Sequence, residues 1–228
     1  MPSDTEDKNL TTDENGLEHH ILHVYDSDAV NTAPKTEKEL LKLYQNNTYL
    51  LYQYISHQVS YFLYGLNNEI RAMFGHLADY RTTNDCMKRE LDKAYGHFRR
   101  TNLDAFKILC DEYDKTFSKI IKKQYKYDLR NAETQDYLKE FGNLYFSAKS
   151  KYLEAQQQER VGSDSEVHNI VAIYHNAAKE YINLKKLYVD NKKQIRKIKF
   201  KTNVEKVLDT IILLISIFVA LVGYLIKV

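Results

Sequence analysis

The chain has 228 residues, of which 43% are hydrophobic and 28% charged, as is usual for a folded domain with extensions. Its two prolines are Pro2 and Pro34, and glycine is scarce. Strand-rich and loop-rich folds need more of both at their turns, so the composition excludes them and predicts an all-α protein with long helices. The net charge of +2 averages an acidic N-terminus and a basic stretch near the C-terminus.

The first 35 residues are polar and acidic, which predicts a mobile N-terminal arm over residues 1–35. Acids stand where a secretory signal peptide would be basic and then apolar, so no cleaved leader is expected. The arm contains three clustered histidines, His19, His20 and His23. A solvated segment, a short strand that pairs with a partner and a metal site are all compatible with this patch, and its role stays open.

Residues 36–162 predict a cytoplasmic bundle of long helices. Thr36 followed by Glu39 matches a capping box, and apolar residues then recur at helical spacing. Three helices are predicted, over residues 36–81, 84–128 and 132–160. Because short turns connect them, we expect antiparallel packing.

A fourth helix with a heptad pattern is predicted over residues 166–206. It ends in a basic collar, the cluster of Lys and Arg side chains between residues 192 and 206. Tyr174, Tyr181, Tyr188 and Ile195 repeat every seven residues, with a second row beginning at Ala177. A seam of about four heptads favours a coiled coil. The alternative is that the same stripe packs on the other three helices.

The run at residues 207–226 is apolar, and as a helix it spans roughly 30 Å, the thickness of a bilayer core. It predicts one C-terminal transmembrane helix. The residues expected at the membrane surface are Lys192, Lys193, Arg196, Lys197, Lys199 and Lys201. This basic bias places the N-terminal domain in the cytoplasm. A bacterial inner membrane is favoured, and the membrane of the endoplasmic reticulum or the outer mitochondrial membrane of a eukaryote is the alternative.

The heptad line extends into the apolar run through Asp209, Ser216 and Gly223. Small residues let membrane helices approach closely, and an acid at the membrane edge needs water or a partner. We therefore expect a homo-oligomer that associates along one line. Its residues are Tyr174, Tyr181, Tyr188, Ile195, Asp209, Ser216 and Gly223. A lone anchor is the alternative.

No phosphate-binding loop, nucleophile elbow or zinc-protease motif is present in the sequence, so neither enzymatic activity nor a cofactor is expected. The spacing of Arg71 and His76 is similar to the motif of HEPN-type ribonucleases, but such a pair is expected by chance. Gly75-His76 is echoed by Gly96-His97, each after an aromatic residue. Close helix packing at the glycines and a binding site are the two interpretations.

Basic side chains share a face of the predicted second helix, which suggests a site for an anionic ligand such as a nucleotide or short nucleic acid. The candidate residues are Arg71, His76, Arg89, Lys93, His97, Arg99, Arg100 and Lys107. A solvated charged face is the alternative. No metal is assigned to these residues.

The runs Ala94–Arg100 and Leu103–Lys107 resemble uncharacterised bacterial helical proteins, and the layout is similar to single-pass membrane effectors of phage-defence operons. This resemblance implies a cytoplasmic domain that senses a nucleotide or oligonucleotide and controls membrane permeabilisation or channel opening. The layout is also similar to syntaxin-type fusion proteins, although the seam lacks their central Gln or Arg. The alternative function is thus a tail-anchored tether or fusion adaptor that binds partner proteins through a coiled coil.

Overall fold

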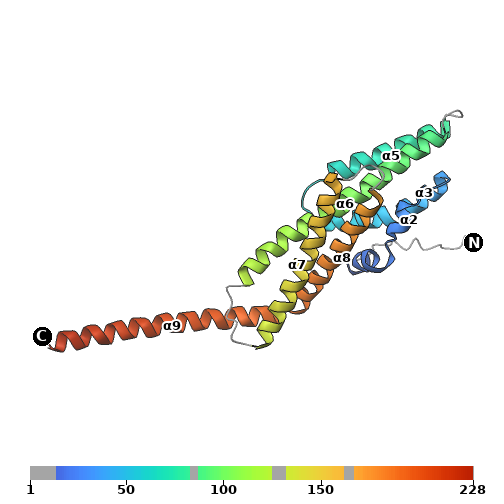
Figure 1. Ribbon diagram of the computed structural model, residues 1–228. Helices are drawn as coiled ribbons and strands as arrows, with labels where there is room; N and C mark the ends of the chain where they lie inside the picture. Colours follow the sequence, from blue (N-terminus) through green and yellow to red (C-terminus); the bar gives the residue numbers. More distant parts are fainter. Residues whose placement is uncertain (1–13, 83–86, 125–131, 162–166, 228) are drawn as a thin grey trace, which may run out of the picture.

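The computed structural model describes residues 14–82, 87–124, 132–161 and 167–227, and most of them are helical (Figure 1). No strand occurs over these ranges, so the all-α prediction is confirmed. The elements in chain order are α1 (Glu14–His19), the π-helical η1 (His20–Val24), α2 (Ser27–Asn31), α3 (Glu37–Leu43), the π-helical η2 (Tyr44–Tyr49), α4 (Leu50–Gln58), α5 (Tyr64–Thr82), α6 (Met87–Gln124), α7 (Ala132–Val161), α8 (Val167–Asp190) and α9 (Lys192–Lys227).

The bundle is built from two antiparallel helix pairs. Helix α5 folds back alongside α6, and α7 runs alongside α8 (Figure 1). Helix α6 also contacts α4, α7 and α8, so it is the element around which the others pack. Large side chains fill the centre, with Phe98, Phe106, Phe141, Tyr174 and Tyr181 completely buried. Burial of each such side chain stabilises the fold by roughly 2–3 kcal/mol, before the loss of chain entropy is subtracted.

The prediction of a mobile arm was wrong for residues 14–31, which belong to the folded bundle. Leu17, Ile21, Tyr25 and Val30 are all buried there. The first three are spaced by four residues, so they form one helical stripe that packs on the bundle. The acidic composition hid this stripe. Residues 1–13 of the predicted arm lie outside the described residues.

Hydrogen bonds attach this N-terminal segment to distant helices. The Nε2–H of His175 on α8 donates to the carbonyl of Ile21 at 2.8 Å. The Tyr25 hydroxyl donates to Oδ1 of Asn102 on α6 at 3.0 Å, and the Tyr95 hydroxyl donates to the carbonyl of Val30 at 3.0 Å. Each bond satisfies a polar group that burial would otherwise leave unpaired.

The cap predicted at Thr36 is confirmed, because its hydroxyl oxygen accepts the backbone N–H of Glu39 at 3.2 Å. The single helix predicted over residues 36–81 is instead divided. Helix α4 ends at Gln58, Val59 is extended at φ −110° and ψ 146°, and α5 begins at Tyr64. No Pro or Gly marks this break. It lets both α4 and α5 pack on α6, so tertiary contacts override local helix propensity.

The heptad tyrosines pack inside the chain's own bundle. Tyr174 and Tyr181 are fully buried, and Tyr188 contacts Phe141 with ring centroids 6.3 Å apart. Their assignment to an oligomerisation line was therefore wrong for Tyr174 and Tyr181, because no surface of either remains for another copy. Ile195 and Gly223 lie outside the described side chains.

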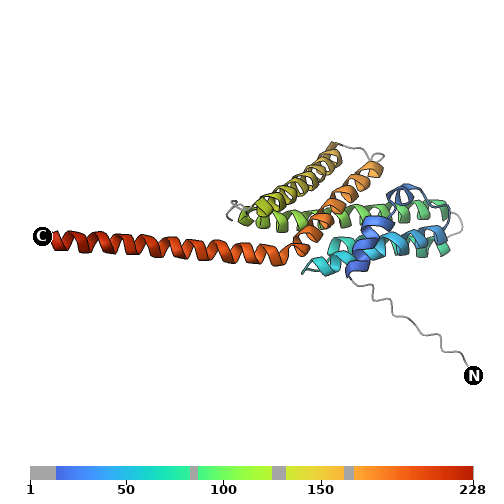
Figure 2. The same cartoon turned by 90° about the horizontal axis from the view of Figure 1, so that it is seen from below.

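The predicted fourth helix is interrupted at Asn191, which separates α8 from α9. The Asn191 side-chain amide donates to the carbonyl of Leu187 at 2.9 Å. Beyond this point α9 projects away from the bundle (Figures 1 and 2).

Among the residues that the structure describes, we find no helix that combines the length and the apolar character needed to cross a membrane. The side chains of residues 218–226, the second half of the predicted transmembrane run, lie outside that description.

Candidate functional site

The α5–α6 hairpin brings the two Gly-His pairs of the sequence together. The imidazole rings of His76 and His97 stack with centroids 5.2 Å apart and 19° between their planes. His76 lies on α5 and His97 on α6. The structure therefore brings the two halves of the near-repeat together, and ligand binding at them stays a prediction.

Two glutamates bind these histidines reciprocally across the hairpin. His76 Nδ1 lies 2.7 Å from Oε2 of Glu90 on α6, and His97 Nδ1 lies 2.7 Å from Oε2 of Glu69 on α5. Each glutamate precedes the histidine of its own helix by seven residues. Because the helices are antiparallel, one Glu-x6-His motif on each gives two facing pairs of the same kind. Sequence reasoning missed both glutamates, although the equal spacing was visible.

Basic side chains hold both glutamates in their charged form. Oε1 of Glu90 accepts hydrogen bonds from Lys93 Nζ at 2.9 Å and Arg89 Nε at 3.2 Å. The bonds from Lys93 and His76, followed by that from Arg89, lower the pKa of Glu90 to about 2. Partial burial raises the pKa of Glu69, but the hydrogen bonds from His97 and Arg100 outweigh it, and the net shift is downward.

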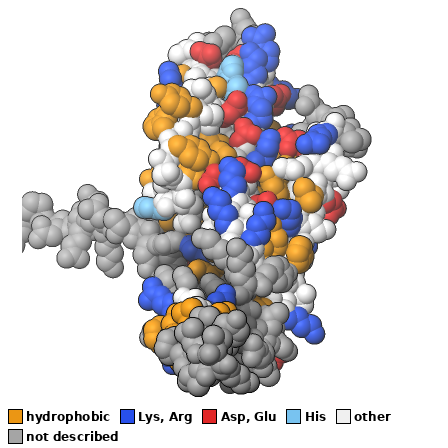
Figure 3. Space-filling view, turned by 90° about the vertical axis from the view of Figure 1, so that its left-hand side faces the viewer, with side chains coloured by type: hydrophobic (Ala, Val, Ile, Leu, Met, Phe, Trp, Pro, Cys, Tyr) orange, Lys and Arg blue, Asp and Glu red, His pale blue; other side chains and the backbone are white. Residues whose placement is uncertain are grey.

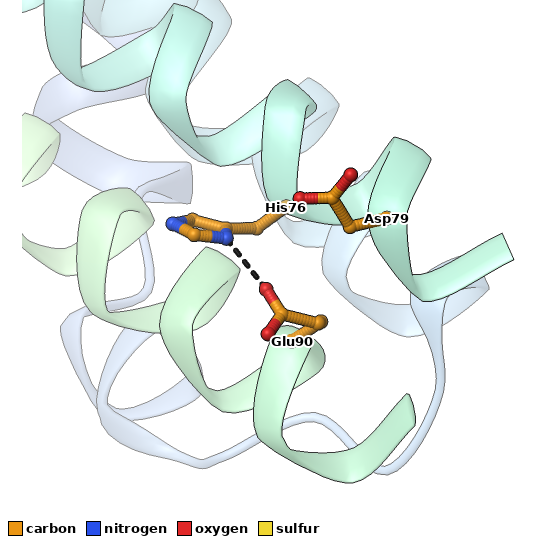
Figure 4. A group of neighbouring side chains, drawn as sticks. All are labelled: His76, Asp79 and Glu90. Carbon is orange, nitrogen blue, oxygen red and sulfur yellow. Dashed lines mark hydrogen bonds and ion pairs between the residues drawn. The ribbon is translucent and has the colours of Figure 1, made fainter. Parts of the chain in front are cut away.

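The two motifs differ three residues after each histidine, one helical turn further on. On α6 that position is Arg100, whose Nε lies 3.0 Å from Glu69 Oε2 and whose Nη2 lies 2.9 Å from His97 Nδ1. On α5 it is Asp79, an exposed acid. One possible ligand atom from each of His76, Asp79 and Glu90 lies within 4.8 Å of the other two (Figure 4).

The remaining candidates for an anion site lie apart from this cluster or are already engaged. Lys107 Nζ contacts Oε1 of Glu159 on α7 at 2.6 Å. The Arg99 guanidinium lies over the Tyr95 ring at 5.7 Å, and Arg71 is exposed on α5. On the face shown in Figure 3, basic and acidic side chains are interspersed. An anionic ligand must compete with these carboxylates, and its binding stays a prediction.

The glycines of the near-repeat do not serve close helix packing. A Cβ atom built on Gly75 or Gly96 meets no heavy atom within 4 Å. That interpretation of the near-repeat was wrong, because an alanine fits at either position.

Comparison of the chain with protein-family models, curated proteins and solved structures finds no match. The resemblances to phage-defence effectors and to syntaxin-type proteins therefore stay predictions.

Proposed function

We propose that this protein is anchored to a membrane by the C-terminal half of α9, and that its helical bundle controls the permeability of that membrane from the cytoplasmic side. The observation that carries the proposal is an apolar surface that the bundle leaves uncovered. Six apolar residues close together on α9 each have between 45% and 60% of their surface exposed. They are Ile211, Ile212, Leu213, Leu214, Ile215 and Ile217.

The magnitudes favour insertion of this segment in lipid. Transfer of one Leu or Ile side chain out of water is worth roughly 1.5–3 kcal/mol, so six supply on the order of 10 kcal/mol. Asp209 opposes insertion, at a cost of about 3 kcal/mol in the middle of a membrane and less at its edge. Its place near the start of the run puts it at the edge, where water reaches it.

The basic collar determines which side of the membrane the bundle lies on. Arg196 and Lys197 are exposed on α9 before the apolar run, while the side chains of Lys192, Lys193, Lys199 and Lys201 lie outside those described. Attraction to anionic headgroups is worth about 1 kcal/mol per basic residue near the surface. A cytoplasmic bundle follows from the same bias.

Control of permeability needs several copies of the protein to assemble in the membrane. Because Tyr174 and Tyr181 are buried in the bundle, they cannot form the contact between these copies. We place this association along α9, where Asp209 and Ser216 are exposed and lie on the predicted line. The alternative of a coiled-coil tether is disfavoured, because Tyr174 and Tyr181 of its seam are already buried in the bundle.

Anchoring is tested by expressing the full chain and a version that ends at Lys206 in bacteria, followed by an alkaline carbonate wash of the membranes. We expect the full chain in the washed membranes and the truncated chain in the supernatant. Leu213→Asp combined with Ile217→Asp should release the protein. Phe146→Asp changes an equally exposed apolar residue on α7 and should not. Full-length protein in the supernatant would contradict the anchor.

Permeability is followed in the same cells with a potential-sensitive dye. Depolarisation by the full chain but not by the truncated one supports the pore, and Asp209→Asn and Ser216→Leu should then alter it. An intact potential in every strain, with the protein still in the membrane, would leave the anchor and reject a constitutively open pore.

A further inference from the structure

We propose that the α5–α6 hairpin binds one divalent transition-metal ion, held by Nδ1 of His76, Oε2 of Glu90 and a carboxylate oxygen of Asp79. This inference does not depend on the membrane anchor. It rests on the comparison of two facing motifs within one hairpin, in one of which an arginine contacts both the histidine and the glutamate.

The motif around His97 shows that a positive charge fits beside a histidine and glutamate paired in this way. Its histidine and glutamate share the Arg100 guanidinium, which lies 2.9 Å from His97 Nδ1 and 3.0 Å from Glu69 Oε2. The motif around His76 has the same Glu-x6-His spacing and the same 2.7 Å pair, but an acid stands at the position of that arginine. Lys93 and Arg89 bind the other oxygen of Glu90, so a cation beside His76 would contact Oε2 of Glu90 and the carboxylate of Asp79, at the place that Arg100 takes in the second motif.

The basic neighbours leave the inner oxygen of Glu90 available. Lys93 and Arg89 both bind Oε1, whereas Oε2 faces His76 (Figure 4). Asp79 reaches the same space from the next turn of α5, since residues three apart share one side of a helix. The ligands thus come from two helices, as in metal sites of other helical bundles.

To fit an ion, the pair of His76 and Glu90 must open slightly, and the Asp79 oxygen, which lies within 4.8 Å of the other two ligand atoms, must move closer to them. Two ligand atoms about 2.1 Å from one Zn²⁺ ion lie roughly 3–3.4 Å apart, so the 2.7 Å between His76 Nδ1 and Glu90 Oε2 must open by about half an ångström. The side chain of His76 is 26% exposed and has room to rotate. On binding, the proton on Nδ1 leaves to water or is carried by Nε2 instead.

The donor set selects the class of metal. One imidazole nitrogen and two carboxylate oxygens suit first-row ions such as Zn²⁺ and Mn²⁺ better than Ca²⁺, which prefers six or more oxygens. Three protein ligands leave at least one coordination position for water or another ligand.

The test is calorimetric titration of the full chain in detergent with ZnCl₂. The exposed pair His19 and His23 has ring centroids 4.9 Å apart and competes for zinc, so all variants are made in a His19→Gln/His23→Gln background. We expect one equivalent of Zn²⁺ in this background. Asp79→Asn should weaken binding at least about 10- to 100-fold, the range seen when a residue that only supports a metal ligand is lost. Asp92→Asn, an exposed acid on the other side of α6, should leave binding unchanged.

Two charge exchanges test the comparison of the motifs itself. Asp79→Arg should abolish binding, since it removes one ligand and places a guanidinium where the ion would bind. Arg100→Asp should add a second equivalent of Zn²⁺. Circular dichroism checks that each variant is folded. Absence of saturable binding in the background, or unchanged binding in both Asp79 variants, would overturn the site. A single equivalent in Arg100→Asp would overturn the correspondence between the motifs on which the assignment rests.

Discussion

His175 on α8 donates a hydrogen bond of 2.8 Å to the carbonyl of Ile21, across 154 residues of sequence. The imidazole is buried, and burial disfavours its charged form. Its pKa is lowered to about 4, mainly by burial and further by the nearby charges of Lys179 and His20, while the bond to Ile21 acts in the opposite direction. This ring therefore stays neutral in the folded protein at pH 7.

The first prediction concerns pH. Because the unfolded chain binds a proton on His175 near pH 6.5 and the folded chain only near pH 4, the contribution of neutral His175 is complete above pH 6.5 and is lost as the pH falls toward 4. The full loss is about 3 kcal/mol. Urea unfolding between pH 4 and 7.5 should show a flatter dependence in His175→Gln than in the wild type. His57→Gln, at an exposed histidine, serves as the control, and equal slopes in His175→Gln and wild type would contradict the prediction.

The second prediction concerns the buried carboxylate of Glu18. Its Oε1 accepts from the Tyr54 hydroxyl at 3.0 Å and from Lys185 Nζ at 2.6 Å. Lys185→Met removes the cation and should lower the free energy of unfolding by about 3 kcal/mol, because a buried charge is left without its partner. The double variant Lys185→Met/Glu18→Gln should lose less free energy of unfolding than the two single variants lose in sum. Denaturant titration measures each variant, with the exposed neighbour Lys186→Met as control, and strict additivity would argue against this coupling.

The third prediction concerns Cys110, which is buried and contacts the carbonyl of Tyr174 at 3.6 Å. Burial raises the pKa of its thiol, so little reactive thiolate forms. In a Cys86→Ser background, Ellman's reagent should label Cys110 at least about 1,000-fold more slowly than a free thiol, because access requires unfolding. The rate should rise in parallel with urea unfolding. Rapid labelling in buffer would mean that α6 and α8 separate locally.

The fourth prediction concerns the glycines within the hairpin helices. Alanine at Gly75 or Gly96 meets open space and lowers the entropy of the unfolded chain. Each change should stabilise the protein by about 0.5–1 kcal/mol. Thermal unfolding checks this, and Gly65→Ala at the second residue of α5 should give a smaller gain. A loss of stability at Gly75 or Gly96 would indicate a need for glycine that the structure does not explain.

The sequence predicts helix capping and buried faces better than it predicts which segments pack together. The Thr36 hydroxyl caps its helix as predicted, since capping depends on neighbouring residues alone. The periodicity of Tyr174 and Tyr181 correctly indicated a buried face, but a period does not say whether another copy or the same chain covers it. The break at Val59 had no local signal. The pairing of Glu69 with His97 depends on the register of α5 against α6, which no single segment contains.

The bond between Ile21 and His175 also sets an order of events during synthesis. A chain made from its N-terminus exposes Leu17, Ile21 and Val30 long before α8 has been translated. These apolar side chains stay exposed until α8 has been synthesised. In that interval the nascent chain can aggregate or be bound by a chaperone. Contacts so distant along the chain also slow folding. The α5–α6 hairpin, whose partners are neighbours in sequence, is complete much earlier in translation.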